Sequence, residues 1–304
     1  MIIRPTKKEA EEFSAYYKPD TAFSAHARLL QSKWRHKNGL PAASYGNFIE
    51  KDHAKSSKAN FLTDNIKDLL QSEIISARKL GALIGEPRIW VNTLSSQPLC
   101  FNLFGELALD LDLATNFFKE IFPGKIKAVT EIKFEYSPGR RTVHCDSSAF
   151  DVFVLYENLF GKKCFIGIEV KYAESLREES KKKAASIFKE HQKTYTSLTT
   201  PDIFKPNAID KLQLTPLSQI WRDHMLALAC RFGSVYDDGF FVFLFPAANK
   251  ECQNGVDKYL DQLINNDEER TFFFPRHLED FIHTLKRIHP TSWTTELRER
   301  YLGS

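Results

Sequence analysis

A strand-like run at Phe165–Lys171 constrains this chain most, because it places two opposite charges inside an otherwise apolar segment. Successive residues of a β-strand point to opposite faces, so Glu169 and Lys171 share one face with Gly167. The two isoleucines and the valine that alternate with them form the other face. Because an unpaired charge on a buried strand is costly, the charged face needs partners, and a divalent cation with a phosphate would supply them.

Three strand-like segments lie in the middle of the chain, and their apolar patterns predict neighbouring strands. They cover residues 128–136, 150–156 and 164–172. The Asn- and Gly-containing residues 157–162 predict a hairpin turn between the second and the third segment. A nearly continuous apolar run at 239–245 predicts a fourth strand that is buried on both faces.

Helical periodicity surrounds these strands. It covers most of the first ninety residues and then residues 98–118, 173–196, 218–232, 257–264 and 277–287. Strands set among helices in this order predict an α/β protein, with a mixed central sheet flanked by helices. We expect a helical N-terminal extension over residues 1–90, and a core with C-terminal helices over residues 91–304.

Composition narrows the class of protein further. The 304 residues are 42% hydrophobic and 27% charged, as is typical of a globular chain. The five cysteines lack metal-binding spacing and suit a reducing compartment. Neither a signal peptide nor an apolar run of about 18 residues is present, so we expect a cytoplasmic protein that does not cross a membrane. The absence of a Gly-rich phosphate loop predicts no nucleotide cofactor.

The net charge of +3 permits a nucleic-acid partner without requiring one, because local basic surface matters more than the total. No Gly-x-Ser-x-Gly elbow of a serine hydrolase is present. The chemistry must therefore be sought in the charged residues of the predicted strands.

Asp151 supplies a second carboxylate, on the apolar run that precedes the hairpin turn. If the second and third segments pair as antiparallel strands, Asp151 and Glu169 lie on neighbouring strands and face the same side. Two carboxylates at this spacing suit Mg²⁺, which prefers oxygen ligands and keeps several waters. Lys171 would hold a water or neutralise charge on phosphorus, and Gly167 would leave room for a phosphodiester. The alternative is a structural Glu–Lys pair beside an unrelated Asp.

This arrangement resembles the core of the PD-(D/E)xK nuclease superfamily, the fold of many restriction endonucleases. Five strings more particularly resemble a family of bacterial proteins predicted to be restriction endonucleases: 95–104 (SSQPLCFNLF), 134–140 (FEYSPGR), 150–153 (FDVF), 168–172 (IEVKY) and 221–224 (WRDH). The resemblance implies a restriction-endonuclease-like sheet and a Mg²⁺ cofactor, with Mn²⁺ as a substitute. It implies that Asp151 and Glu169 bind the metal and that Lys171 activates or positions water. Phe150 departs from the proline that names the motif.

The superfamily often carries another acid on the helix before the first strand. Glu106 fits this place best and is the expected additional catalytic and metal-binding acid, with Asp110 and Asp112 as rivals. Glu135, at the end of the first strand, is a further candidate. The alternative for each is an exposed carboxylate without a role in the site.

Four other residues are candidates for contacts with nucleic acid. Arg140 and Arg141 follow a Ser-Pro-Gly turn beside the expected site and would clamp a phosphate, although a solvated loop explains them equally well. Gln219 and Arg222 are three residues apart on a predicted helix, share a face, and would add polar groups near the site. His224 on the same helix fits a core histidine better.

We therefore expect a Mg²⁺-dependent DNA endonuclease that hydrolyses phosphodiester bonds in restriction or anti-phage defence. One alternative is a catalytically inactive nucleic-acid-binding or scaffold protein on a nuclease fold. Another is a nuclease that acts on RNA or in repair. Cleavage of a duplex would favour a homodimer, but the sequence decides neither the oligomeric state nor the recognition site.

Overall fold

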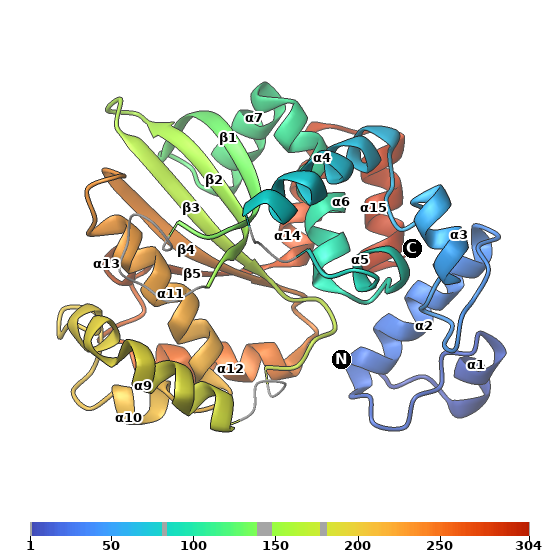
Figure 1. The fold of residues 1–304 in the computed structure, drawn as a ribbon, viewed down its shortest axis with the longest axis horizontal. Coiled ribbons are helices and arrows are strands. Elements are labelled where there is room, and N and C mark those ends of the chain that lie inside the picture. Colours follow the sequence, from blue (N-terminus) through green and yellow to red (C-terminus); the bar gives the residue numbers. More distant parts are fainter. Residues whose placement is uncertain (1, 81–83, 139–147, 177–180, 304) are drawn as a thin grey trace.

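The computed structural model describes residues 2–80, 84–138, 148–176 and 181–303, and its centre is one five-stranded sheet (Figure 1). The strands run in the spatial order β1-β2-β3-β4-β5. Their bounds are β1 Ile126–Tyr136, β2 Phe150–Asn158, β3 Lys163–Val170, β4 Asp238–Phe245 and β5 Phe273–His277. β1, β2 and β3 pair antiparallel, whereas β3, β4 and β5 pair parallel. The predicted mixed sheet is therefore confirmed, and so is the antiparallel hairpin that joins β2 and β3.

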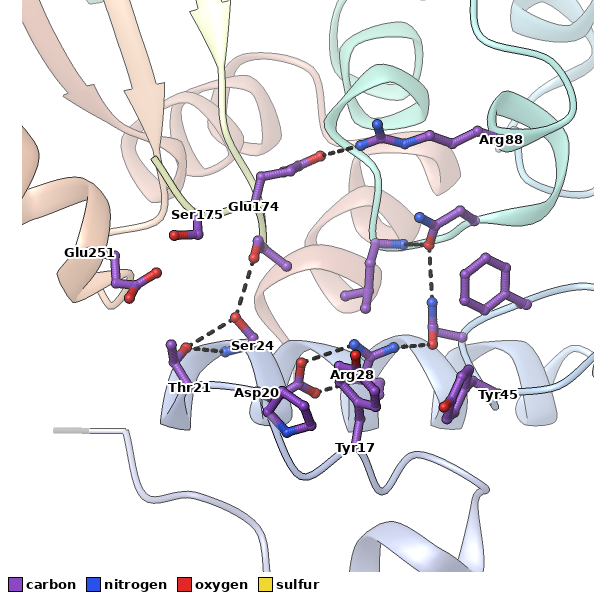
Figure 2. Close-up of a pocket in the computed structure, with 16 residues that line it drawn as sticks. Tyr17, Asp20, Thr21, Ser24, Arg28, Tyr45, Arg88, Glu174, Ser175 and Glu251 are labelled. Carbon is purple, nitrogen blue, oxygen red and sulfur yellow. Dashed lines mark hydrogen bonds and ion pairs between the residues drawn. The ribbon is translucent and has the colours of Figure 1, made fainter. Parts of the chain in front are cut away.

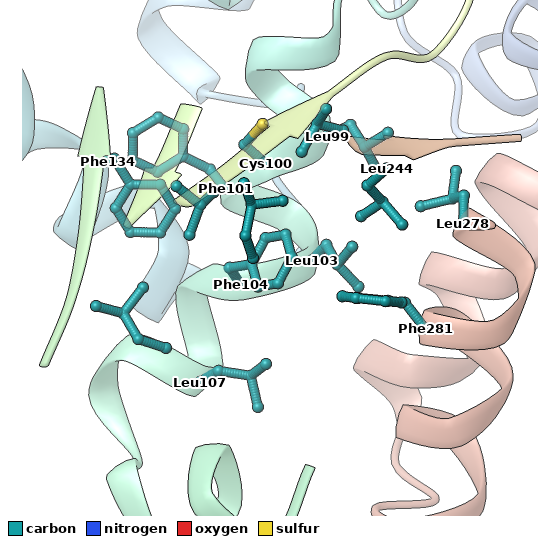
Figure 3. Close-up of a cluster of buried hydrophobic side chains, with 14 of the residues drawn as sticks. Leu99, Cys100, Phe101, Leu103, Phe104, Leu107, Phe134, Leu244, Leu278 and Phe281 are labelled. Atoms are coloured by element: carbon teal, nitrogen blue, oxygen red, sulfur yellow. The ribbon is translucent and has the colours of Figure 1, made fainter. Parts of the chain in front are cut away.

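One face of the sheet packs on the helices α6, α7 and α14, and α15 packs on α14. Their bounds are α6 Ser96–Leu109, α7 Leu111–Ile121, α14 Leu278–Ile288 and α15 Ser292–Leu302. Helix α6 is apolar on nearly its whole surface and is buried between the sheet and α14, as a helix without a polar face requires (Figure 3). Phe101 of α6 stacks on Phe134 of β1 with ring centroids 4.3 Å apart, and Phe104 contacts Phe281 of α14. This packing fixes α6 against the strands that carry the candidate site.

The other face of the sheet is covered by the helices of the β3–β4 and β4–β5 connections (Figure 1). These helices are α9 Lys181–Leu198, α10 Ile209–Leu212, α11 Leu217–Arg231, α12 Lys250–Leu260 and α13 Glu268–Thr271. Strand β4 is buried on both faces, as its apolar run predicts. Phe241 and Phe243 pack toward α11, and Val242 packs toward α6.

The N-terminal helices pack beside the α6 layer. They are α1 Lys7–Glu12, α2 Ala22–Lys37, α3 Lys51–Ser57, α4 Asp64–Leu80 and α5 Arg88–Val91. Phe23, Ile49 and Trp90 belong to the same buried cluster as the sheet residue Val170, so these helices share a core with the sheet. No helix in the described part of the chain is long and apolar enough to span a bilayer.

The helix predicted at residues 98–118 is two helices in the structure. Asp110 separates α6 from α7 because its backbone is extended and its side chain accepts a hydrogen bond from the Leu113 amide at 2.9 Å. Asp110, a rival candidate for the additional acid, is thus the N-cap of α7.

Several other parts of the sequence prediction differ from the structure. The helix predicted at residues 257–264 is α12, which spans Lys250–Leu260. Residues 173–176 are not helical, and the charged helix begins at Lys181. Strand β5 and helix α15 were not predicted, because β5 is a five-residue edge strand that contains Pro275, and α15 carries polar residues on most of its surface.

Candidate active site

Three carboxylates lie at one level of the sheet, on three neighbouring strands. The antiparallel registers place Asp151 of β2 between Glu135 at the end of β1 and Glu169 at the end of β3. The strand pairs on either side of this level are Phe134 with Val152, Tyr136 with Phe150, and Val152 with Ile168. The structure therefore brings Asp151 and Glu169 together as the sequence predicts.

Lys171 and Gln219 both bind the same oxygen of Glu169. Lys171 Nζ lies 2.6 Å from Glu169 Oε1, and Gln219 Nε2 donates to that oxygen at 2.9 Å. Asp151 Oδ2 accepts a hydrogen bond from the Val170 amide at 2.7 Å. The hydrogen bonds among the described residues thus occupy one oxygen of each carboxylate and leave Glu169 Oε2 and Asp151 Oδ1 without a donor.

The charged pair on β3 is deeply buried. Glu169 is 6% exposed and Lys171 is 8% exposed, so each charge depends on the other and on Gln219 for compensation. Ile166, Ile168 and Val170 pack into the α6 side of the sheet, while Phe165 packs on the α11 side. The predicted division of β3 into an apolar and a charged face is therefore confirmed.

The expectation that Gly167 leaves room for a phosphodiester is wrong. The ring of Phe150 fills the space above it, and a Cβ atom built on Gly167 would lie 2.5 Å from Phe150 Cε1. Phe150 in turn stacks on Phe153 with ring centroids 5.7 Å apart. The glycine is needed for close packing of an aromatic ring beneath the carboxylates, not for the approach of a ligand.

Excess negative charge marks this cluster. Burial raises the pKa of Asp151 well above its usual range, and the neighbouring Glu169 and Glu135 raise it further. Burial lowers the pKa of Lys171, but Glu169, Asp151 and Glu174 outweigh this effect and raise it above its usual value. Lys171 is thus a charged ammonium group among carboxylates, and its single charge does not balance theirs.

Glu135 is held by Gln97 in the first turn of α6. Gln97 Nε2 donates to Glu135 Oε1 at 2.6 Å. Burial raises the pKa of Glu135 to about 7; Gln97 and Lys171 lower it in part, and Glu169 raises it. Glu135 also has a φ of 47°, a conformation that non-glycine residues rarely adopt and that often marks functional sites.

Glu106 lies in the last turn of α6, at the end of the helix remote from Gln97. The rise of an α-helix separates these two turns by roughly 14 Å along its axis. The Glu106 carboxylate accepts hydrogen bonds from Thr63 Oγ1 and from Asn65 Nδ2, the latter at 3.2 Å. The structure gives Glu106 no contact with Asp151 or Glu169 among the described residues, whereas Glu135 lies beside them.

The residues predicted to contact nucleic acid lie in different places relative to the site. Arg140 and Arg141 lie outside the described residues. Gln219 reaches the site through Glu169, and Arg222 is half-buried one turn later on α11. His224 is a core histidine, as expected: its Nδ1 lies 2.8 Å from the Tyr259 hydroxyl, and burial lowers its pKa to about 3.

Glu174 and Gln97 are site residues that the sequence did not single out. Glu174 Oε1 accepts the Ser96 amide at 2.6 Å and pairs with Arg88 at 3.2 Å (Figure 2). Ser96 precedes Gln97, so Glu174 ties the residues after β3 to the start of α6. Gln97 lies within the string SSQPLCFNLF, and that resemblance was the one sequence signal that could have pointed to it.

The donor atoms of this cluster decide which cation it can hold. No group of three or more His, Cys, Asp or Glu side chains in the described ranges is arranged to hold a metal alone. The pair Asp151 and Glu169 offers two carboxylate oxygens, and all the available ligand atoms are oxygen. Mg²⁺ sites for phosphate chemistry are commonly built from one or two carboxylates, with water and substrate completing the shell. The pair therefore fits Mg²⁺.

Comparison with known proteins adds one match. A family model described as the PD-(D/E)XK nuclease superfamily matches residues 18–303, nearly the whole chain. No curated protein and no solved structure gives a significant match.

Proposed function

Because the chain belongs to the PD-(D/E)XK nuclease superfamily, we propose that it is a Mg²⁺-dependent endonuclease that hydrolyses phosphodiester bonds of DNA. The observation that carries this proposal is the pair of open carboxylate oxygens, Asp151 Oδ1 and Glu169 Oε2, beside the ammonium group of Lys171. We place the activity in restriction or anti-phage defence, on the resemblance of five strings to a family of bacterial proteins predicted to be restriction endonucleases.

Asp151 and Glu169 would hold the metal ion. Burial raises the pKa of Asp151, and repulsion by Glu169 and Glu135 raises it further, so a cation bound here would relieve an unfavourable concentration of charge. Bound Mg²⁺ supplies Lewis-acid polarisation of the phosphoryl oxygen and lowers the pKa of a bound water. Mn²⁺ would fill the same oxygen site.

Lys171 supplies positive charge next to the reacting phosphate. Its ammonium group has three donors, and Glu169 Oε1 takes one of them, so others can orient a water or stabilise charge on phosphorus. Gln219 holds Glu169 Oε1 from the α11 side, which turns the opposite oxygen of this carboxylate toward the site. Second contacts of this kind orient metal ligands.

Glu135 is the acid that the structure offers in place of one from α6. It lies opposite Asp151 and is oriented by Gln97. With a pKa of about 7, Glu135 can accept or release a proton near neutral pH. We propose that it acts as a proton acceptor or as a ligand through water at this site.

Cleavage of supercoiled plasmid tests the function. The wild type should nick or linearise DNA with Mg²⁺ or Mn²⁺, whereas Asp151→Asn and Lys171→Ala should lose activity by about 100-fold or more. Lys133→Ala is a matched control, because Lys133 pairs with Glu131 two residues away on β1 at 3.1 Å, outside the cluster. This variant should cleave like the wild type.

If Asp151→Asn and Lys171→Ala cleave DNA as fast as the wild type, these two residues are not catalytic. A parallel panel of single-stranded and duplex RNA separates DNA from RNA as substrate. Cleavage of RNA alone would replace the DNA proposal with the RNA one. Absence of cleavage on every nucleic acid, with no metal binding, would favour an inactive scaffold on the same fold.

A further inference from the structure

A pocket of about 550 Å³ lies between helix α2 and the residues that follow strand β3 (Figure 2). We call it the α2 pocket. Its volume falls within the range of roughly 300–1,000 Å³ that is usual for small-molecule sites. Its lining combines tyrosine rings, the amide groups of two asparagines, two arginines and three carboxylates.

Arg28 is locked in place on the floor of the α2 pocket. Its Nε and Nη2 bind both carboxylate oxygens of Asp20, at 2.7 and 3.0 Å, and its Nη1 donates to Asn47 Oδ1 at 2.6 Å. Three of the five N–H groups of the guanidinium are thereby bonded, and its flat faces remain available for contact with aromatic rings.

Two tyrosine rings lie against this guanidinium group. The Arg28 Cζ atom is 5.0 Å from the ring centroid of Tyr17 and 5.7 Å from that of Tyr45. The rings meet edge to face with centroids 5.5 Å apart. Tyr17 is 40% exposed and Tyr45 is 36% exposed, so each ring keeps open surface. Preorganised aromatic rings beside an arginine plane are the surfaces on which unpaired bases stack.

The charges of the α2 pocket disfavour an anionic ligand. Its described lining carries three carboxylates, Asp20, Glu174 and Glu251, against the two guanidinium groups of Arg28 and Arg88. Both arginines are already paired with a carboxylate. A phosphate would meet net negative charge here, whereas a neutral aromatic ring would not.

Amide groups beside the rings can read the edge of such a ligand. Asn92 Oδ1 already accepts hydrogen bonds from Asn47 Nδ2 at 3.0 Å and from the Leu94 amide at 3.1 Å. The side-chain NH₂ of Asn92 can therefore donate hydrogen bonds to a ligand in the pocket. Base edges present acceptors that match such a donor.

The α2 pocket shares a wall with the candidate active site. Glu174 lines the pocket, follows Lys171 closely in sequence and raises its pKa. Glu174 also binds the amide of Ser96, next to the Gln97 that orients Glu135. The α2 pocket is therefore lined by the segment that leaves β3 just after Glu169 and Lys171, where phosphodiester cleavage is proposed.

We propose that the α2 pocket takes an unstacked nucleobase of the substrate strand, stacked on Tyr45 with the Tyr17 ring against its edge and bonded by Asn92. This inference rests on the proposed nuclease function. Removing a base from the stack costs energy, and stacking on aromatic side chains returns part of it. Tyr45 would thus hold the base, and Asn92 would select it, because stacking tolerates every base whereas an amide group reads the base edge.

The first test measures binding of the four deoxynucleosides to the full-length wild type by saturation-transfer NMR. At least one should bind saturably, and its 5′-monophosphate should bind no tighter. Tyr45→Ala should weaken binding by about 10-fold, and Tyr45→Phe should keep it, since the ring is retained. Tyr16→Ala is the matched control, because Tyr16 is 37% exposed and does not line the pocket.

The second test distinguishes a base in the strand from a free nucleoside. The plasmid cleavage sites are first mapped. Duplexes are then made that carry 2-aminopurine at each position around a cleavage site in turn. Ca²⁺ replaces Mg²⁺ so that binding is measured without cleavage. Wild type and Tyr16→Ala should change the 2-aminopurine fluorescence at one position, and Tyr45→Ala should not. Thermal melting of each variant confirms that it is folded.

A wild type that cleaves DNA but gives no fluorescence change at any position would overturn the base pocket and leave the nuclease function standing. Nucleoside binding without that fluorescence change would overturn the substrate-strand proposal in favour of a free nucleoside. If neither the wild type nor any variant cleaves DNA, the proposed nuclease function is wrong. That result is distinct from the two above, and the inference rests on that function.

Discussion

Glu169, at the end of strand β3, and Lys171, just beyond that end, form a salt bridge of 2.6 Å, and both side chains are almost fully buried. The pair does not neutralise its surroundings, because Asp151 and Glu135 lie on the two adjacent strands. A structural ion pair would be complete in itself. This one is embedded in excess negative charge, which is the state expected of a cation site whose ligands are carboxylates.

Gln219→Ala should lower the turnover of DNA by roughly 10-fold without unfolding the protein. The substitution removes the donor that holds Glu169 Oε1 at 2.9 Å, so the carboxylate turns more freely. Gln253→Ala serves as the control, because Gln253 binds the exposed Asp257 on α12. Steady-state cleavage rates of the three proteins check the prediction, and equal rates would show that Gln219 does not orient the site.

Glu135→Gln should reduce cleavage by about 10-fold or more, whereas Glu106→Gln should stay within about twofold of the wild type. The reason is position: Glu135 lies beside Asp151, and Glu106 is bound to Thr63 and Asn65 at the other end of α6. Cleavage rates of both variants at saturating Mg²⁺ decide between them. A large loss of cleavage rate in Glu106→Gln, with none in Glu135→Gln, would show that the additional acid is Glu106 on α6.

The stability of the metal-free protein should fall as the pH rises through neutrality. Glu135 has a pKa near 7 in the folded protein, above the usual value of 4.5. The folded state therefore binds a proton more tightly than the unfolded state, so the stabilisation is complete below pH 4.5 and is lost as the pH rises through about 7. The raised pKa of Asp151 acts in the same direction.

Glu135→Gln should remove part of this pH dependence. In EDTA the variant should be more stable than the wild type by about 1–2 kcal/mol at pH 8, and the two should be similar near pH 5. Urea unfolding at both pH values measures the difference. A wild type that gains stability relative to Glu135→Gln between pH 5 and pH 8 would contradict the raised pKa.

Gly167→Ala should destabilise the fold by about 1–3 kcal/mol, because the new methyl group meets the Phe150 ring at 2.5 Å. Gly85→Ala is a suitable control, since its nearest neighbour would be Gln97 Oε1 at 3.7 Å. Phe150→Leu in the Gly167→Ala background should recover part of the loss. Thermal melting of the variants tests this, and an unchanged melting temperature would mean that the ring moves aside freely.

The central strands could be predicted from the sequence because their signals are local. The charged and apolar faces of β3 follow from strict alternation, and β4 follows from an apolar run buried on both sides. The hairpin between β2 and β3 then places Asp151 level with Glu169. These residues need no information from distant parts of the chain.

The rest of the site depends on contacts between segments that are far apart in sequence. Gln97 meets Glu135 only because α6 packs on β1, and Gln219 reaches Glu169 only because α11 lies on the opposite face. The filling of the space above Gly167 by Phe150 is likewise a matter of packing across strands. Glu106 fitted the spacing expected of a helical acid, but spacing does not reveal which end of α6 faces the sheet edge.

A crystal soaked in Mn²⁺ gives the most direct test of the metal site. Anomalous scattering locates the ion without assumptions about activity. We expect a peak within about 2.0–2.3 Å of both Asp151 Oδ1 and Glu169 Oε2, and its loss in Asp151→Asn. A peak at Glu106, or none between Asp151 and Glu169 at saturating Mn²⁺, would contradict the account.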